Sequence, residues 1–212
     1  VLCLQEIKCR TDQFPSKAFQ KLGYGHIAVH GQKGYHGVAT VARRPFAKTA
    51  SRAFCGNDDA RHLVVTLDGD RPIDIHNFYV PAGGDVPDPQ INDKFAHKLA
   101  FLTEMADWAK DTGLKDKAAI LLGDLNVAPL EWDVWNHKRL LRNVGHTPTE
   151  TAHMERLWQA ADLIDVDERP AIAAHLPGEQ SHSQVLFADV ERRSRQVDQQ
   201  VRLRLGEGGD GV

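Results

Sequence analysis

The sequence predicts an α/β fold in which sheets are covered by helices, and three observations lead to this prediction. Apolar runs of β-strand type are interspersed with segments of helical spacing along most of the chain. With 42% hydrophobic and 26% charged residues, the 212-residue chain has the composition of a globular protein and the length for a sizeable core. It contains no internal repeat and no low-complexity linker. Such a pattern is typical of one layered domain.

Strands dominate the first eighty residues. Residues 1–7 begin as a buried strand, so we expect the N-terminus to be truncated within the fold. Residues 14–22 have helical spacing, and the sequence Asp-Gly-Asp at 68–70 is a hairpin turn signal. Further strands are expected at residues 24–30, 37–43, 62–67 and 73–80.

Helices become more frequent in the second half of the chain. Residues 91–110 are predicted to form a long amphipathic helix, followed by a strand at 118–126 and helical stretches at 132–141 and 151–161. The apolar stripe of the long helix consists of Phe95, Leu99, Leu102, Met105 and Ala106.

Charge and cysteine content limit the classes of function. The formal net charge is −3, so any nucleic-acid site must be a local basic patch balanced by acidic residues elsewhere. Three cysteines form no metal-binding spacing and fit a reducing cytoplasm. No apolar run is long enough to cross a bilayer. We therefore expect a cytoplasmic protein that does not bind membranes, and we expect it to be a monomer.

The segment Ile-Leu-Leu-Gly-Asp-Leu-Asn-Val-Ala-Pro at 120–129 is the most informative motif. A buried strand ends at Gly123, and Asp124 and Asn126 follow two residues apart, so they would project together from the strand's C-terminal edge. A carboxylate can hold a hard cation or accept a proton from water, and Asn can orient a phosphate. Taken alone, the motif also fits a common Asp/Asn turn.

Two further strands end in chemically useful side chains. Glu6 follows four residues of buried character, which favours a metal ligand, although a salt bridge to Lys8 or to an arginine explains it equally well. Tyr79 precedes Val-Pro at the end of another strand, where its hydroxyl can contact a phosphate. A core tyrosine with its hydroxyl at the surface is the alternative.

Several residues could contact a nucleic acid. Tyr35 lies between glycines at 34 and 37 and could stack on a base, while Lys8 and Arg61 could bind phosphate. Basic side chains on a surface usually face solvent, and this alternative remains. The sequence shows no paired-histidine metal motif, no Ser-His-Asp signal and no phosphate-binding Gly-rich loop.

The order of these motifs resembles the exonuclease–endonuclease–phosphatase superfamily. Within it, Leu-Cys-Leu-Gln-Glu-Ile-Lys-Cys at 2–9, Tyr-Val-Pro-Ala-Gly-Gly at 79–84 and Gly-Asp-Leu-Asn-Val-Ala-Pro at 123–129 are similar to bacterial exodeoxyribonuclease III. Asp-Val-Trp-Asn-His-Lys at 133–138 supports the same resemblance. The resemblance covers residues 1–177 and implies a two-sheet β-sandwich flanked by helices in four layers.

The resemblance also assigns roles to individual residues. It implies that Tyr79, Asp124 and Asn126 are catalytic, with Asp124 activating the attacking water. It implies a Mg²⁺ site, with Mn²⁺ as an alternative metal, and it implies DNA-backbone contacts. The implied metal ligands are Glu6, Asp124, Asn126 and Asp198, and the implied DNA-binding residues are Lys8, Tyr35 and Arg61.

The implied activity is that of a DNA-repair nuclease. It would hydrolyse phosphodiesters in double-stranded DNA from 3′ ends and at abasic sites. Hydrolysis of a phospholipid or inositol phosphate is a rival substrate class, and the motifs around Lys8 and residues 135–137 argue against it. The alternative that is not an enzyme is a catalytically inactive remnant of the family that only binds DNA.

The C-terminal region departs from the family pattern. After residue 177 the chain becomes polar and ends in a glycine-rich sequence, so we divide it into a partial catalytic domain at 1–177 and an aberrant or disordered tail at 178–212. The family's first active-site Asn would lie upstream of Val1. Gln199 follows Asp198 where the family has a catalytic His, and Gln cannot carry a proton as imidazolium does. We therefore expect this chain to have little or no nuclease activity.

Overall fold

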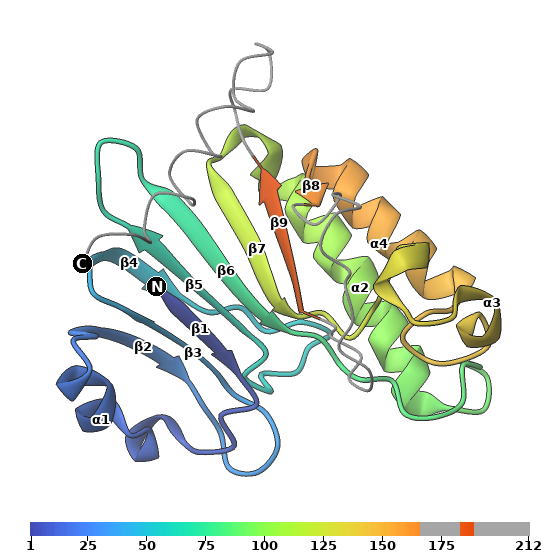
Figure 1. Cartoon of the computed structure of the whole chain (residues 1–212), viewed down its shortest axis with the longest axis horizontal. Helices are drawn as coiled ribbons and strands as arrows, with labels where there is room; N and C mark the ends of the chain where they lie inside the picture. The colour runs from blue at the N-terminus through green and yellow to red at the C-terminus, as the bar shows by residue number, and fades with distance from the viewer. Residues whose placement is uncertain (166–182, 189–212) are drawn as a thin grey trace, which may run out of the picture.

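Two β-sheets pack face to face in the computed structural model, which describes residues 1–165 and 183–188 (Figure 1). The smaller sheet has the strand order β1-β3-β2, and all its pairs are antiparallel. The larger sheet has the order β4-β5-β6-β7-β9-β8. The strands of the smaller sheet are β1 (Leu2–Gln5), β2 (His26–His30) and β3 (Val38–Ala42). Those of the larger sheet are β4 (Phe46–Ala50), β5 (His62–Leu67), β6 (Ile73–Tyr79), β7 (Ala119–Asp124), β8 (Ile164–Asp165) and β9 (Ser183–Ala188).

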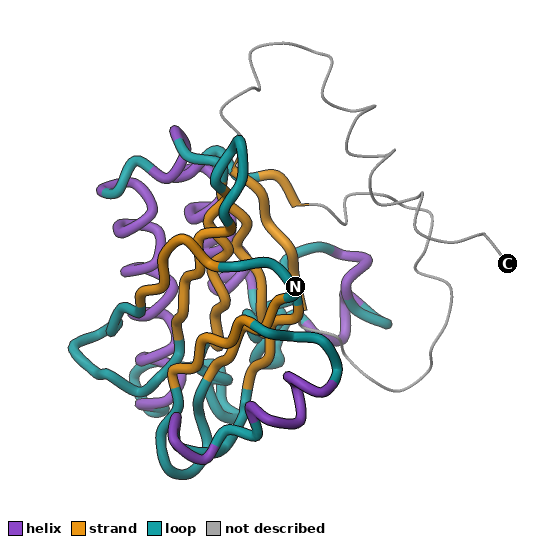
Figure 2. The backbone as a smooth tube through the Cα atoms, turned by 90° about the vertical axis from the view of Figure 1, so that its left-hand side faces the viewer, coloured by secondary structure: helices purple, strands orange, loops and turns teal. Residues whose placement is uncertain are grey.

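Helices cover the outer faces of both sheets, as Figures 1 and 2 show. The helix α1 (Ser16–Lys21) lies beside the smaller sheet, and α2 (Asp93–Asp111) and α4 (Pro148–Ala161) pack on the larger one. The short helix α3 (His137–Leu140) lies near the end of α2 where that helix begins. Three 3₁₀ turns complete the described helical segments, at Thr11–Gln13, Leu114–Asp116 and Glu131–Asp133.

Each interface between layers has its own hydrophobic cluster. Phe14, Ala39 and Val41 pack between α1 and the smaller sheet, and Val38 and Ile75 belong to the cluster between the two sheets. The largest cluster joins the larger sheet to α2 and α4. The predicted sandwich with flanking helices is therefore confirmed, and three buried clusters hold four layers together. Members of the largest cluster include Phe54, Phe78, Phe101, Leu102, Met105, Leu121, Met154 and Leu157.

The connection between β6 and β7 brings the candidate site residues to one edge. β6 and β7 are parallel, and α2 forms the crossover between them. Both strands therefore end at the same side of the sheet, where Tyr79 and Asp124 are register partners. The motif residues at the ends of these two strands therefore lie next to each other in the fold.

The helix boundaries follow local capping chemistry. Asn92 caps α2 by accepting a hydrogen bond from the Lys94 N–H, and Gly113 follows the helix in the left-handed conformation at φ 60°. The predicted helix at 91–110 is thus shifted slightly, to Asp93–Asp111. The predicted helical stretch at 132–141 is broken, because a 3₁₀ turn ends at Asp133 and α3 begins only at His137.

One part of the predicted tail pairs with the sheet. The tail at 178–212 is predicted to be aberrant or disordered, yet Ser183–Ala188 form β9, antiparallel to β7. The run Val-Leu-Phe at 185–187 has strong β-propensity and offers partners to an otherwise open edge of β7. The remainder of that range, including Asp198, lies outside the described residues, and the division at residue 177 stays a prediction.

None of the helices within residues 1–165 is both long and apolar enough to span a membrane.

Candidate active site

Glu6 and Tyr79 connect the ends of two strands from different sheets. Glu6 follows β1 in a left-handed conformation with φ 49°. Tyr79 ends β6, and its hydroxyl donates a hydrogen bond of 2.5 Å to Glu6 Oε1. Lys8, also left-handed at φ 52°, places its Nζ 2.8 Å from Glu6 Oε2. Each oxygen of the Glu6 carboxylate therefore has a partner. Glu6 and Lys8 both keep a left-handed backbone conformation, which is unfavourable for these residue types.

Asp124 and Asn126 join this cluster at the end of β7. Asp124 is the register partner of Tyr79, so the two residues lie side by side on neighbouring strands. Asn126 is left-handed at φ 52°, and its N–H donates to Asp124 Oδ1 over 3.1 Å. The Asn126 side chain donates to Val80 O at 2.9 Å. The extended alternation expected from the sequence therefore stops at Asp124, and a turn sets the position of Asn126.

The contacts of Glu6 and Tyr79 shift their pKa values in opposite directions. The bond to Lys8, followed by the bond from Tyr79, holds the pKa of Glu6 below its ordinary value. Burial, followed by the bond to the Glu6 carboxylate, raises the pKa of Tyr79 well above its ordinary value. At neutral pH Glu6 is therefore a carboxylate and Tyr79 a neutral phenol. A neutral phenol donates a hydrogen bond, so this arrangement does not support a phenolate.

Arg61 is more deeply embedded than its place in the sequence suggested. Its guanidinium lies 5.0 Å from the centroid of the Tyr79 ring, and Nη1 donates to Tyr79 O over 3.1 Å. Nε pairs with the carboxylate of Asp59, and Nη2 lies 2.8 Å from His36 Nε2. The Arg61 side chain is only 10% exposed, and its contacts hold both the ring and the backbone of Tyr79 in place. Its predicted contact with DNA stays a prediction.

His36 is a site residue that the sequence reasoning missed. Because Arg61 can only donate, His36 Nε2 accepts, and the neutral ring carries its proton on Nδ1. The Gln32 side-chain amide lies 2.7 Å from His36 Nδ1, and the ring also hydrogen-bonds with the Asp59 backbone. Burial and the Arg61 charge lower the pKa of His36 and keep the ring neutral. The sequence feature that could have identified His36 is its position next to Tyr35 in the segment flanked by Gly34 and Gly37.

Two amide side chains, one of them fully buried, join the two sheets near the site. Gln5 Nε2 donates to Asn77 Oδ1 at 2.6 Å, and Asn77 is completely buried. The Asn77 amide in turn donates to Leu4 O at 3.2 Å and to Ala39 O at 3.0 Å. These bonds tie β1 and β3 to β6. They fix the distance between the sheets close to Glu6 and Tyr79.

Comparison with known proteins identifies the family. Residues 1–176 match the Endonuclease/Exonuclease/phosphatase family. The chain belongs to this family. It is 30% identical over 168 residues to exodeoxyribonuclease III of Haemophilus influenzae, which covers 74% of this chain and 61% of that protein. The predicted resemblance to exodeoxyribonuclease III is thereby confirmed.

Two further comparisons agree with this family. A DNA-(apurinic or apyrimidinic site) endonuclease of Dictyostelium discoideum is 30% identical over 155 residues, covering 71% of this chain and 40% of that protein. The structure of an AP endonuclease from Archaeoglobus fulgidus superposes with a TM-score of 0.74 at 24% identity, covering 88% of this chain and 75% of that one. That likeness supports the fold. The chain thus spans 61% and 40% of the lengths of these two curated relatives, in each case less than two thirds.

The side chains at this edge fit a hydrated divalent cation. Nucleases of this family generally use divalent metal ions. Within residues 1–164 there is no group of three or more His, Cys, Asp or Glu that could enclose a metal. Mg²⁺ does not need one, because it keeps several waters and binds through one or two carboxylates. Glu6, whose side chain is 42% exposed, and Asp124 supply hard oxygen donors on either side of Tyr79.

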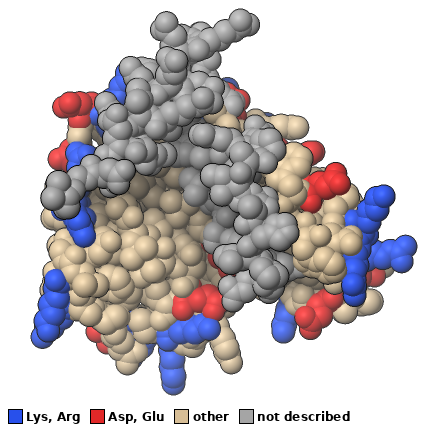
Figure 3. Space-filling model, viewed as in Figure 1, with Lys and Arg blue, Asp and Glu red and all other residues tan. Residues whose placement is uncertain are grey.

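The structure thus brings Glu6, Tyr79, Asp124 and Asn126 to one edge, as the sequence predicted. Lys8 pairs with Glu6 there, while Tyr35 is 80% exposed in the loop between β2 and β3. On the face in Figure 3, the coloured Lys and Arg side chains are scattered, and some of them lie near acidic residues. The catalytic, metal-binding and DNA-binding roles of these residues stay predictions.

Proposed function

We propose that this edge of the sandwich is the phosphodiesterase site of a DNA-repair nuclease that uses Mg²⁺. The observation that carries the proposal is the meeting of three strand ends at Tyr79. Its hydroxyl binds Glu6, which follows β1, and its register partner on the neighbouring strand is Asp124 at the end of β7. The Asn126 side chain binds the carbonyl of Val80, the residue after Tyr79. A carboxylate pair, a phenol and an amide around one point suit the in-line attack of water on a phosphate.

Each residue has a distinct task in this proposal. Asp124 accepts the proton of the attacking water, and Tyr79, a neutral donor, hydrogen-bonds a phosphate oxygen. Glu6 holds the metal ion, which supplies positive charge near the phosphate oxygens when bound. A ligand at Glu6 competes with Lys8, which is then available for a phosphate. Asp198 is the additional metal ligand in this proposal and lies outside the described residues.

The proposed substrate is double-stranded DNA, cleaved from 3′ ends and at abasic sites. Support comes from two similar proteins, an exodeoxyribonuclease III and an endonuclease for apurinic or apyrimidinic sites. Tyr35 supports it too, because a phenol ring that is 80% exposed can stack on a base. Phosphate contacts from Lys8 would position the strand without reading its sequence.

A nuclease assay tests the proposal. The substrates are a duplex with an abasic-site analogue and a duplex with a recessed 3′ end, each with Mg²⁺ or with a chelator. The nuclease proposal predicts cleavage that requires the metal ion and that Asp124→Ala lowers roughly 10²–10⁴-fold, whereas the inactive chain expected from Gln199 would leave both substrates intact. The matched control is Asp107→Ala, which removes an exposed carboxylate on α2 that pairs with Arg156. Equal rates for the wild type and Asp124→Ala would contradict the proposal.

The second candidate function is DNA binding without cleavage. It rests on Gln199, which follows Asp198 where the resemblance places a catalytic His. Backbone contacts do not depend on that histidine, so binding could persist without hydrolysis. A wild-type chain that shifts the abasic duplex in a gel but leaves it intact with Mg²⁺ would favour this candidate over the nuclease.

A further inference from the structure

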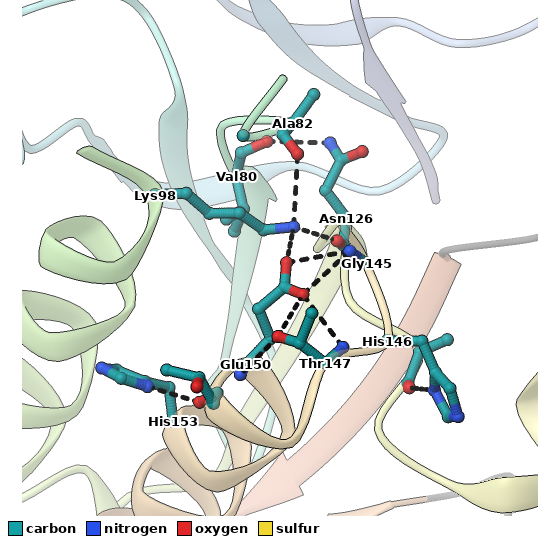
Figure 4. A network of polar contacts seen from close by, with 12 residues as sticks. Val80, Ala82, Lys98, Asn126, Gly145, His146, Thr147, Glu150 and His153 are labelled. Carbon is teal, nitrogen blue, oxygen red and sulfur yellow. Dashed lines mark hydrogen bonds and ion pairs between the residues drawn. The ribbon is translucent and has the colours of Figure 1, made fainter. Parts of the chain in front are cut away.

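A fully buried lysine lies beneath the candidate site. The Lys98 ammonium, from α2, has three acceptors: Asn126 O at 2.5 Å, Glu150 Oε1 at 2.5 Å and Ala82 O at 3.3 Å (Figure 4). A lysine ammonium has three N–H donors, so its hydrogen bonds are complete. Burial lowers the pKa of Lys98, and Glu150 opposes this effect. The complete set of acceptors explains how a charge is accommodated at a fully buried position.

Glu150 is equally well satisfied. Both carboxylate oxygens lie 2.9 Å from the Gly145 N–H, and Oε2 also accepts from the N–H and hydroxyl of Thr147 at 3.1 and 2.7 Å. Thr147 and Glu150 form the capping box that begins α4. One carboxylate therefore starts a helix and anchors Lys98, as the dashed lines of Figure 4 show.

The acceptors of Lys98 belong to the segments that carry the site. Ala82 follows the end of β6, three residues after Tyr79, and Asn126 follows the end of β7, two residues after Asp124. Asn126 is left-handed, a conformation that asparagine adopts more readily than most residues with a side chain. Two interactions hold it there: its carbonyl accepts from Lys98, and its amide side chain donates to Val80 O.

The chain makes room for this lysine at Gly83. Gly83 has φ 90°, and a Cβ added there would lie 2.8 Å from Lys98 Cδ and 3.1 Å from Val144 Cγ1. The loop after β6 is therefore shaped around the stem of Lys98 as well as around its charge.

We propose that Lys98, held by Glu150, is a positioning residue that fixes the turn at Asn126 and so places Asp124 and Asn126 beside Tyr79. The inference rests on the proposed function, since it concerns the same site. Lys98 acts through backbone carbonyls and does not contact the reacting groups. The competing explanation is that Lys98 only balances the Glu150 charge at the start of α4.

Amide hydrogen exchange separates these explanations. The Asn126 N–H donates to Asp124 Oδ1, so its exchange reports the turn, while the Leu121 N–H within β7 reports the sheet. We expect Lys98→Met to raise the exchange rate of Asn126 relative to Leu121 roughly tenfold or more, as for loss of a hydrogen bond to a charged group. A purely structural role would raise both rates together and leave their ratio unchanged.

Thr147→Val is the matched control from the same network. It removes the hydroxyl that binds Glu150 and weakens the cap of α4, but it leaves the Lys98–Asn126 bond in place. We expect it to leave the Asn126 to Leu121 ratio at the wild-type value. Where Lys98→Met does not fold, Glu150→Gln replaces it, because Gln keeps the shape and weakens the anchor of Lys98. An unchanged ratio in the variant measured, or an equal rise in Thr147→Val, would overturn the proposal.

The exchange measurement needs neither DNA nor a metal ion. A wild-type chain that does not cleave DNA would contradict the proposed function and leave the exchange result intact. With an active wild type, we expect Lys98→Met to lower kcat about a hundredfold with little change in KM, as for a displaced reactive group. A change confined to KM would count against positioning.

Discussion

Among the residues that the structure describes, two Lys–Glu ion pairs lie close to the site, and one is exposed whereas the other is buried. Lys8 and Glu6 lie 2.8 Å apart with side chains that are 57% and 42% exposed. Lys98 and Glu150 lie 2.5 Å apart and are both fully buried. The first pair joins residues two positions apart in one loop, whereas the second joins two helices. The same charges therefore serve different purposes.

The difference follows from solvation. In the exposed pair, water can replace either partner at little cost, so a metal ion can take Glu6 and a phosphate can take Lys8. In the buried pair, removal of one partner leaves a charge that nothing else can solvate. The site thus combines an outer pair that can exchange partners with an inner pair that holds the backbone in place.

Breaking the inner pair should have the largest effect. We expect Lys98→Met to lower the free energy of unfolding by about 3–5 kcal/mol, because the Glu150 carboxylate remains buried without its counter-ion. Urea denaturation measures the change. The double variant Lys98→Met/Glu150→Gln should lose less than the sum of the two single variants, because the second change removes the uncompensated charge. Additive losses would mean that the two residues act independently.

A buried pair without a counter-ion provides a second test of solvation. His62 and His76 are hydrogen-bonded at 3.0 Å against Trp108, and neither His62 Nδ1 nor His76 Nε2 has a partner. Burial lowers the pKa of His76 from 6.5 to about 4, and it lowers the pKa of His62 as well. Between pH 6.5 and about pH 4, the unfolded chain binds a proton at His76 that the folded chain does not bind. The stability that His76 contributes is therefore lost as the pH falls from 6.5 to about 4, and this contribution levels off below that range.

The expected size of this acid loss is roughly 3 kcal/mol for His76 alone, at about 1.4 kcal/mol per pKa unit. Chemical denaturation at several pH values measures it. His76→Asn should flatten the stability profile between pH 6.5 and 4. Glu6, whose pKa is lowered, contributes stability that is lost only below about pH 4.5, so its contribution should persist in this variant. An unchanged slope above pH 4.5 in His76→Asn would contradict the assignment to burial.

Much of the fold could be predicted because its periodicities are local. The strand predicted at 62–67 is β5 with the same bounds, and the other predicted strands lie within a few residues of their positions. The strand β4 at Phe46–Ala50 was missed, because it is an edge strand whose residues are mostly exposed and show little apolar pattern. Strand ends that carry Glu6, Tyr79 and Asp124 could be recognised from their motifs.

The support beneath the site could not be predicted in the same way. Lys98 lies among apolar positions of the long helix, three residues after Phe95 and four before Leu102, but a helical pattern does not tell which charge is buried. The sequence Thr-Pro-Thr-Glu at 147–150 is a recognisable capping box. Its meeting with Lys98 depends on how α2 and α4 pack, which is a tertiary property.

At the outer pair, Tyr79→Phe should have a moderate effect. The change removes one hydrogen bond to Glu6 and keeps the ring against Arg61, so we expect a loss of about 1 kcal/mol in unfolding free energy. The pKa of Glu6 should rise toward its ordinary value, because the Tyr79 bond is one of the two main causes of its lowering. A carbon-13 titration of the Glu6 carboxyl group measures this. A Glu6 pKa that falls or stays constant would show that Lys8 alone sets it.

Lys8→Met should change stability least. Its ammonium is exposed, so water takes its place at Glu6, and the free energy of unfolding should stay near the wild-type value at moderate salt. The pKa of Glu6 should nevertheless rise, and by more than in Tyr79→Phe, because the Lys8 bond is the largest cause of its lowering. High salt should weaken the electrostatic part of this difference by screening. If Lys8→Met were instead as destabilising as Lys98→Met, the outer pair would be a fixed structural element, and an incoming metal ion or phosphate could not readily displace it.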